Sequence, residues 1–148
     1  MLSASLDGHK KRLLVIACTA TKRNLTNSAA IDVYNGPSFR VLRKANIRNV
    51  DVLIISANYG LIGSDFKISN YNRKMTKKRA QELRNEVSVK LDKSLASGNY
   101  DEVFVELGKT YQRAIKIDFE KFPNTKFTVD NGEIGIRLHN LKSWLERN

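Results

Sequence analysis

The 148-residue sequence is poor in residues that cross-link or interrupt a chain, with one cysteine, Cys18, and two prolines, Pro37 and Pro123. A single thiol cannot form a disulfide within the chain, and it lacks the paired Cys/His spacing of a zinc site. We therefore predict a fold without disulfides in a reducing compartment, the cytoplasm. No metal and no cofactor are predicted.

The sequence also lacks a long apolar run. No stretch approaches the roughly 20 apolar residues that cross a bilayer, and residues 1–12 show no apolar segment after a charged start. We therefore expect neither export nor membrane insertion. Hydrophobic residues make up 41% of the chain, which is enough for one core. We predict one domain over residues 12–148, preceded by a flexible basic tail over residues 1–11.

Acidic residues are scarce in one part of the chain only. Residues 1–93 hold 18 Lys/Arg and 7 Asp/Glu, whereas residues 94–148 hold 8 of each, so the net charge of +11 lies entirely in the first part. A basic surface concentrates polyanions. The charge therefore predicts a nucleic acid or nucleotide-like ligand as partner, and a surface that serves solubility alone is the alternative.

Apolar runs of strand length alternate with segments of helical periodicity. The expected strands cover residues 13–17, 51–56, 102–107 and 126–129. The expected helices cover residues 37–45, 76 to about 95, 109–122 and 133–145. Such alternation is typical of right-handed crossovers between parallel strands. We predict an α/β three-layer sandwich with a mainly parallel sheet of about four strands and flanking helices.

Loops with residues that can bind or react follow all four of these strands, the last of them Asp130-Asn131-Gly132. Open parallel sheets bind ligands beyond the carboxyl ends of their strands, so these residues are expected to share one rim. The catalytic candidates are Lys22, Cys18 and Ser56. The ligand-binding candidates from the loops are Thr19, Tyr59, Gly60, Gly108 and Tyr111.

Each of the main candidates has a simpler alternative. Lys22 leaves a buried strand and is a candidate nucleophile or electrostatic clamp, or else a surface lysine. Cys18 is a candidate thiolate, or else a small buried side chain at a strand end. Tyr59 could stack on a base or plug the edge of the sheet. Residues 108–110 read Gly-Lys-Thr like the end of a phosphate loop, but Val103 replaces the earlier glycine, so a phosphate loop is rejected.

A cluster of cations crosses the start of the long helix expected from residue 76. Positive charge there opposes the helix dipole, so a bound phosphate backbone would explain it, and an exposed basic turn without a partner is the alternative. The two histidines, His9 and His139, are predicted to be structural or exposed. The nucleic-acid-binding candidates are Arg73, Lys74, Lys77, Lys78 and Arg79.

Several motifs in order resemble a known family. They are Cys18-Thr-Ala-Thr-Lys22, Asp32-Val-Tyr34, Ser38-Phe-Arg40, Ser56-Ala-Asn-Tyr59-Gly-Leu61 with Tyr71, Leu107-Gly108 with Tyr111, and Gly135 with Leu141 and Trp144-Leu145. Over about residues 12–146 they resemble a small family of uncharacterised domains related to the YaaA peroxide-stress family. The stretch from Ser56 to Met75 is similar to YaaA itself, a DNA-binding protein, and this resemblance implies an association with nucleic acid.

A more distant likeness is to the core domain of archaeosine synthase, which modifies a base in transfer RNA. Cys18, Lys22, Tyr34 and Ser38 fall on its Cys, Lys, Tyr and Ser when a long insertion follows Lys22. The prolines and the histidine of that motif are absent. The likeness adds Tyr34 and Ser38 to the ligand-binding candidates.

Two functions of different kinds follow. The first is a nucleic-acid-associated enzyme, a transferase or hydrolase, that acts on a nucleobase, nucleoside or nucleotide through the Cys/Lys rim. The alternative is a non-catalytic nucleic-acid-binding or stress-response module. A sensor of a phosphosugar or nucleotide would use the rim without a nucleophile.

Overall fold

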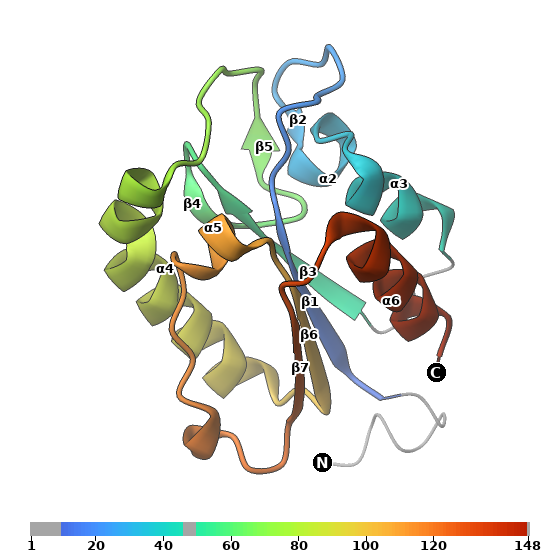
Figure 1. Cartoon of the computed structure of the whole chain (residues 1–148), viewed down its shortest axis with the longest axis vertical. Helices are drawn as coiled ribbons and strands as arrows, with labels where there is room; N and C mark the ends of the chain where they lie inside the picture. Colours follow the sequence, from blue (N-terminus) through green and yellow to red (C-terminus); the bar gives the residue numbers. More distant parts are fainter. Residues whose placement is uncertain (1–9, 46–49, 148) are drawn as a thin grey trace.

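A five-stranded sheet forms the middle of the molecule in the computed structural model, which describes residues 10–45 and 50–147 (Figure 1). Its strand order is β4-β3-β1-β6-β7, and β4 alone runs antiparallel to its neighbour. The strands are β1 (Arg12–Ala17), β3 (Val50–Ser56), β4 (Gly60–Gly63), β6 (Glu102–Glu106) and β7 (Lys126–Asp130). The predicted parallel α/β sheet is confirmed, with β4 as an additional strand.

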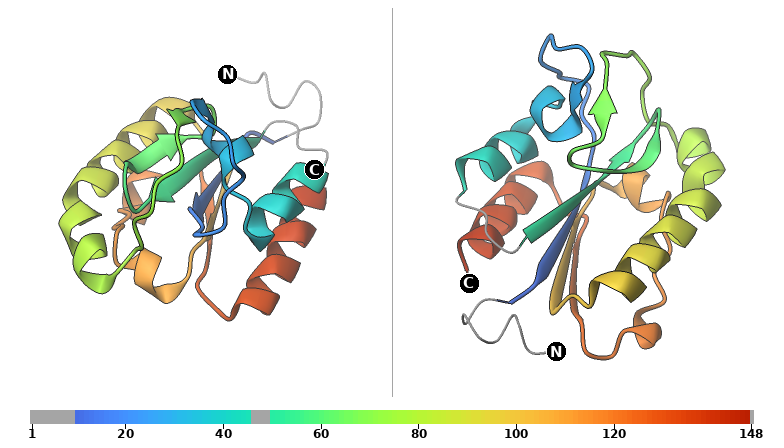
Figure 2. Two further views of the ribbon diagram at one scale, coloured as in Figure 1. Left: turned by 90° about the horizontal axis from the view of Figure 1, so that it is seen from above. Right: turned by 180° about the vertical axis from the view of Figure 1, so that it is seen from behind.

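Helices cover both faces of the sheet, as the view from above shows (Figure 2). On one face lie α2 (Ala30–Val33), α3 (Pro37–Lys44) and α6 (Ile134–Glu146). On the other lie α4 (Lys77–Gly98) and α5 (Lys109–Gln112). A separate two-stranded sheet joins β2 (Ser28–Ala29) and β5 (Lys67–Ile68). The three-layer sandwich expected from the sequence is therefore present.

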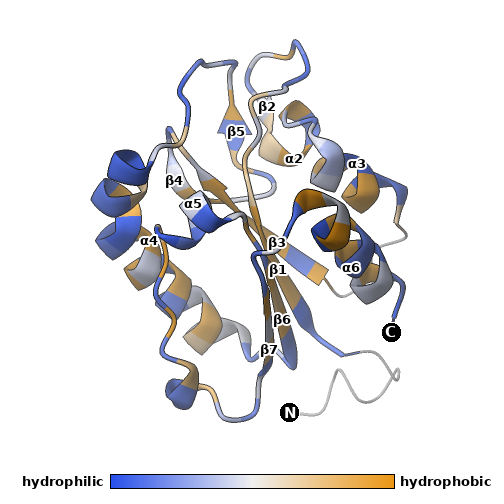
Figure 3. Ribbon diagram, in the orientation of Figure 1, coloured by the Kyte–Doolittle hydropathy of each residue, from blue (hydrophilic) through white to orange (hydrophobic). Residues whose placement is uncertain are grey.

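Strand β1 supplies both hydrophobic cores because its side chains alternate between the two faces. Leu14 and Ile16 pack toward α3 and α6, whereas Leu13 and Val15 pack toward α4. Figure 3 shows hydrophobic residues along the central strands and hydrophilic residues at the start of α4. No helix in the described part of the chain is long and apolar enough to cross a membrane.

The helix predicted over residues 109–122 is wrong in length. Helix α5 ends at Gln112, and only a 3₁₀ turn, η1 (Phe119–Lys121), follows. Beyond Gln112 the backbone N–H groups of residues 113–115 bond three residues back, and Lys116 N–H donates to Ser88 Oγ of α4 at 2.9 Å. The side chain of α4 thus replaces the helical acceptor, and the chain turns away.

Residues 1–9, which hold most of the predicted tail and His9, lie outside the described residues. The two tail residues that are described contact the body of the domain. The backbone N–H of Lys11 donates to Asp101 at 2.8 Å, and Lys10 pairs with Glu102 at 3.1 Å.

The connections after β1 and β6 leave the sheet in opposite directions. The chain after β1 continues to α3, which packs against α6, whereas the chain after β6 enters α5, which packs against α4. Adjacent parallel strands whose loops diverge to opposite faces leave a crevice at their carboxyl ends. This topology places a crevice between β1 and β6.

Candidate functional site

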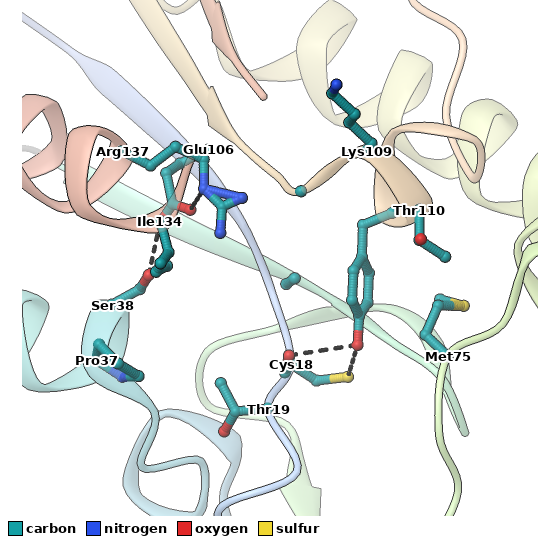
Figure 4. Close-up of a pocket in the computed structure, with 13 residues that line it drawn as sticks. Cys18, Thr19, Pro37, Ser38, Met75, Glu106, Lys109, Thr110, Ile134 and Arg137 are labelled. Atoms are coloured by element: carbon teal, nitrogen blue, oxygen red, sulfur yellow. Dashed lines mark hydrogen bonds and ion pairs between the residues drawn. The ribbon is translucent and has the colours of Figure 1, made fainter. Parts of the chain in front are cut away.

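A cavity of about 350 Å³ occupies this crevice. Its size lies at the lower end of the range for small-ligand pockets, roughly 300–1,000 Å³. Figure 4 shows Pro37, Ser38 and Ile134 on one side of it, Met75 and Thr110 on the other, and Cys18 between them. The lining residues are Ala17, Cys18, Thr19, Pro37, Ser38, Met75, Glu106, Gly108, Lys109, Thr110, Tyr111, Ile134 and Arg137.

A buried polar network lies at one wall of the cavity. Glu106, the last residue of β6, is only 3% exposed. Its Oε1 accepts a hydrogen bond from Ser38 Oγ at 2.7 Å, and its Oε2 lies 3.2 Å from Nε of Arg137. Burial raises the pKa of the Glu106 carboxyl, although Ser38 and Arg137 act in the opposite direction. A carboxyl group thus faces the cavity with fixed orientation, held by α3 and α6.

Two glycines allow these walls to approach each other. A Cβ added to Gly36, the residue before α3, would lie 2.3 Å from Cγ2 of Thr19. A Cβ on Gly108 would lie 3.1 Å from Nη1 of Arg137. Glycine at these positions permits the close approach of Thr19 and Arg137, because real Cβ contacts are rarely so short.

The thiol of Cys18 lies between these two sides of the cavity, next to Tyr111 (Figure 4). Its Sγ is 3.2 Å from the hydroxyl of Tyr111 and 3.4 Å from the backbone N–H of Ala57. Burial is the main cause that raises the pKa of Tyr111, so this hydroxyl keeps its proton at neutral pH. The hydroxyl of Tyr111, on α5, and the backbone N–H of Ala57, which follows β3, are therefore both available as donors to the sulfur.

A second cluster gathers beside the cavity, around the hydroxyl of Ser56. This hydroxyl lies 3.2 Å from the hydroxyl of Tyr34 and 3.0 Å from that of Tyr71, and the two tyrosine hydroxyls are 2.7 Å apart. Ser56 also accepts from the backbone N–H groups of Asn58 and Tyr59, both at 3.1 Å. Desolvation is the main cause that raises the pKa of Tyr34 to about 12.

Lys22 lies over this tyrosine cluster and outside the lining of the cavity. Its Nζ is 4.4 Å from the ring centroid of Tyr71 and 5.9 Å from that of Tyr34. The ring of Tyr59 also packs edge-on against Tyr71, with 5.5 Å between centroids. The structure thus brings Lys22, Tyr34, Ser56 and Tyr59 together around Tyr71.

The predicted rim is therefore divided into two neighbouring groups. Five of the predicted residues line the cavity, namely Cys18, Thr19, Ser38, Gly108 and Tyr111. Gly60 belongs to neither group: it begins β4 with a φ of 77°, a left-handed conformation that favours glycine. Its part is to shape the turn between β3 and β4.

The predicted nucleic-acid-binding cations differ in their surroundings. Arg79 donates from Nε to the carbonyl of Ala57 at 2.7 Å and pairs with Glu82, so it supports the turn after β3. The other four are exposed and take part in none of the ion pairs of the described residues, and they are Arg73, Lys74, Lys77 and Lys78. They flank Met75, which lines the cavity.

Sequence reasoning missed Glu106 and Arg137, the two charged residues of the buried network. A signal existed for each: Glu106 ends an apolar strand, and Arg137 lies four residues before the buried Leu141 on α6. A charge on the buried face of an element needs a partner. In residues 10–45 and 50–147 there is no group of three or more metal-binding side chains.

Comparison with known protein families matches most of this chain to a family model. A model described as a family of unknown function (DUF6884) matches residues 13–143. The matched region contains every strand of the central sheet except the first residue of β1, and all residues that line the cavity. No curated protein matches the chain.

Proposed function

The chain belongs to this family of unknown function, and we propose that it is a nucleic-acid-associated enzyme that acts on a nucleobase, nucleoside or nucleotide in the cavity between β1 and β6. The observation that carries the proposal is that the polar network of Ser38, Glu106 and Arg137 and the thiol of Cys18 line the same cavity of about 350 Å³. The cavity joins apolar walls to a few fixed polar groups, as small-molecule sites do.

The size and lining of the cavity favour a flat heterocycle as the bound group. Apolar side chains border it on two sides, with Ile134 and Pro37 on one and Met75 on the other (Figure 4). A carboxylate at the wall can accept N–H groups from the edge of a base, and Glu106 retains lone pairs beyond those used by Ser38 and Arg137. Arg137 supplies positive charge for a phosphate at this wall.

Of the three predicted catalytic residues, Cys18 is the one in the cavity lining, so we assign it the reaction. A thiol attacks an electrophilic carbon as the thiolate, and the hydroxyl of Tyr111 at 3.2 Å is placed to donate to the sulfur when it carries charge. The role of Lys22 as a nucleophile remains a prediction. Its position over the ring of Tyr71 suits an electrostatic role. Ser56 is fully buried under two tyrosines.

The four exposed cations around Met75 support a substrate that is part of a nucleic acid. A phosphate backbone along the start of α4 would bring a base to the side of the cavity that Met75 lines. The same cations favour the second candidate, a nucleic-acid-binding module without turnover. The likeness to YaaA and to archaeosine synthase is compatible with both and stays a prediction.

Mass spectrometry distinguishes the two candidates. The protein is incubated with nucleobases, nucleosides, nucleotides and short DNA and RNA oligonucleotides, and substrate loss and new masses are recorded. We expect one nucleobase-containing substrate to be consumed, Cys18→Ser to stop its turnover, and Ser38→Ala to weaken its binding. Ser97→Ala, an exposed hydroxyl on α4, is the matched control.

The same variants show which residue carries the reaction and whether the protein is an enzyme. If Lys22→Ala stops turnover and Cys18→Ser does not, Lys22 and not Cys18 is the catalytic residue. If nothing is consumed and only nucleic acid binds, with a dependence on Lys77 and Lys78, the binding module replaces the enzyme.

A further inference from the structure

Strand β7 ends the sheet without a further strand on its outer side among the described residues. Lys126 N–H and the carbonyl of Asp130 both bond toward β6 and its flanking residues, to Asp101 at 2.9 Å and Leu107 at 3.1 Å. Backbone groups alternate in direction along a parallel strand, so those of Phe127 and Val129 point outward. In Figure 1 no helix lies in front of β7.

Exposed apolar side chains flank this edge in all three layers. Val129 of β7 is 44% exposed, and Phe119, which packs edge-on against Phe127 at 4.9 Å, is 47% exposed. On the other face, Asn140 of α6 donates to Asp130 at 2.8 Å. Ile136, one turn before Asn140 and so on the same stripe of α6, is 58% exposed.

We propose that β7 pairs with β7 of a second copy of this chain, antiparallel about a twofold axis at Thr128, to give one continuous sheet through a dimer. In this register the outward backbone groups of Phe127 face those of Val129 in the second copy, which matches the hydrogen-bonded pairs of an antiparallel ladder. The register follows from the alternation along β7. The proposal does not depend on the function of the cavity.

The charges of β7 are complementary to themselves in this arrangement. The strand reads Lys-Phe-Thr-Val-Asp, so Lys126 of each copy lies opposite Asp130 of the other, and Thr128 lies opposite Thr128. Asp130 already accepts from Gly132 N–H and Asn140, and a carboxylate has room for a further donor. A parallel pairing in register would instead oppose like charges.

The distribution of charge along the chain is compatible with a dimer through β7. The net charge of +11 lies in residues 1–93, whereas residues 94–148, which contain β7, Phe119 and Ile136, hold 8 basic and 8 acidic residues. Two copies that meet through this neutral half keep their basic halves apart. Charged end residues often protect an edge strand from pairing, but opposite charges at the two ends favour antiparallel self-pairing.

Sedimentation or light scattering over a range of protein concentrations tests the proposal. We expect the wild type to pass from one to two times the protomer mass of 16.8 kDa as its concentration rises. Thr128→Lys and Thr128→Glu each oppose like charges on the axis, so each alone should be monomeric, whereas their equimolar mixture should recover the dimer. Thr26→Lys and Thr26→Glu, at an exposed position in the basic half, should leave the wild-type dimer intact.

Circular dichroism confirms that each variant is folded. Lys126→Glu, at an exposed position, provides a second test because it opposes Asp130 of the other copy, so it too should be monomeric. A wild type that stays monomeric at every concentration would overturn the proposal. So would a dimer that the folded Thr128 and Lys126 variants leave unchanged.

Discussion

The carboxyl group of Glu106 is buried in the folded protein, where it contacts Ser38 and Arg137. Burial raises its pKa above the ordinary value even though Ser38 donates to it and Arg137 lies beside it. Because the pKa is higher in the folded than in the unfolded protein, folding favours the neutral form. The contribution of Glu106 to the free energy of unfolding is therefore fully present at low pH. It is lost as the pH rises through the pKa that Glu106 has in the folded protein.

Glu106→Gln should therefore change how stability depends on pH. The amide cannot ionise, so we expect the wild type to lose stability relative to this variant as the pH rises from about 4 toward 7. Denaturant unfolding of both proteins at each pH gives the difference, with exposed Glu120→Gln as the control. A difference that is constant over this range would contradict the assigned direction of the pKa.

Gly36 is a residue whose missing side chain allows the chain before α3 to pack closely against Thr19. Gly36→Ala brings a Cβ to 2.3 Å from Cγ2 of Thr19, and we expect a loss of about 1–3 kcal/mol in the free energy of unfolding, the usual cost of overpacking. Removing the opposing side chain with Thr19→Gly in the same protein should restore part of that loss. Thermal or denaturant unfolding measures both.

Gly135 is the matched glycine for this test. An added Cβ there meets no atom within 4 Å, and the residue lies inside α6, so Gly135→Ala should stabilise by roughly 0.5–1 kcal/mol. Equal effects of alanine at the two glycines would show that the contact with Thr19 does not constrain the fold.

At the scale of elements, the apolar runs predicted the parallel strands well. The central strands occur within one residue of their expected bounds because a strand buried on both faces leaves a continuous apolar run. Strand β4 was missed, since its sequence Gly-Leu-Ile-Gly is short and bounded by glycines. The segment after α5 kept a helical pattern in sequence, but contacts with α4 decided its course.

The site was predictable only in part, because some of its residues are positioned by contacts between segments that are distant in the sequence. The loops that carry Cys18, Thr19, Gly108 and Tyr111 follow from where the strands end, and the structure brings them together. The position of Lys22 depends on its packing over Tyr71, a contact between distant segments that the order of the motifs does not specify. The wall formed by Glu106 and Arg137 depends on how α6 returns to the sheet.

The first turn of α4 contains positive charge where a helix favours negative charge. Lys77→Glu and Lys78→Glu should each raise the free energy of unfolding by about 0.3–1 kcal/mol through the helix dipole, while they weaken nucleic-acid binding. Lys93→Glu, an exposed change of the same kind nearer the end of α4, should not improve stability. Unfolding and fluorescence-anisotropy titrations measure the two effects, and variants that gain stability without any loss of binding would exclude these lysines from the interface.

At the scale of the whole molecule, the uneven charge predicts how binding responds to salt. Binding to single-stranded nucleic acid should weaken as salt rises, with a slope of about 0.7 per phosphate contacted on logarithmic axes. Joint change of Lys74, Lys77 and Lys78 to Ala should make that slope shallower. Arg79 is left unchanged because it supports the turn after β3. Affinity that is independent of both salt and these lysines would rule out an electrostatic contact.

The central claim is that the cavity between β1 and β6 binds a nucleobase-containing ligand, and NMR titration tests it most directly. Nucleoside monophosphates are added to the ¹⁵N-labelled protein and the backbone amide shifts are followed to saturation. We predict that one of them gives saturable shifts largest at Thr19, Ser38, Gly108, Thr110 and Arg137, all of which line the cavity, and that Ser38→Ala weakens this binding. Shifts confined to Arg73, Lys74, Lys77 and Lys78, or no saturable shifts with any monophosphate, would contradict the account.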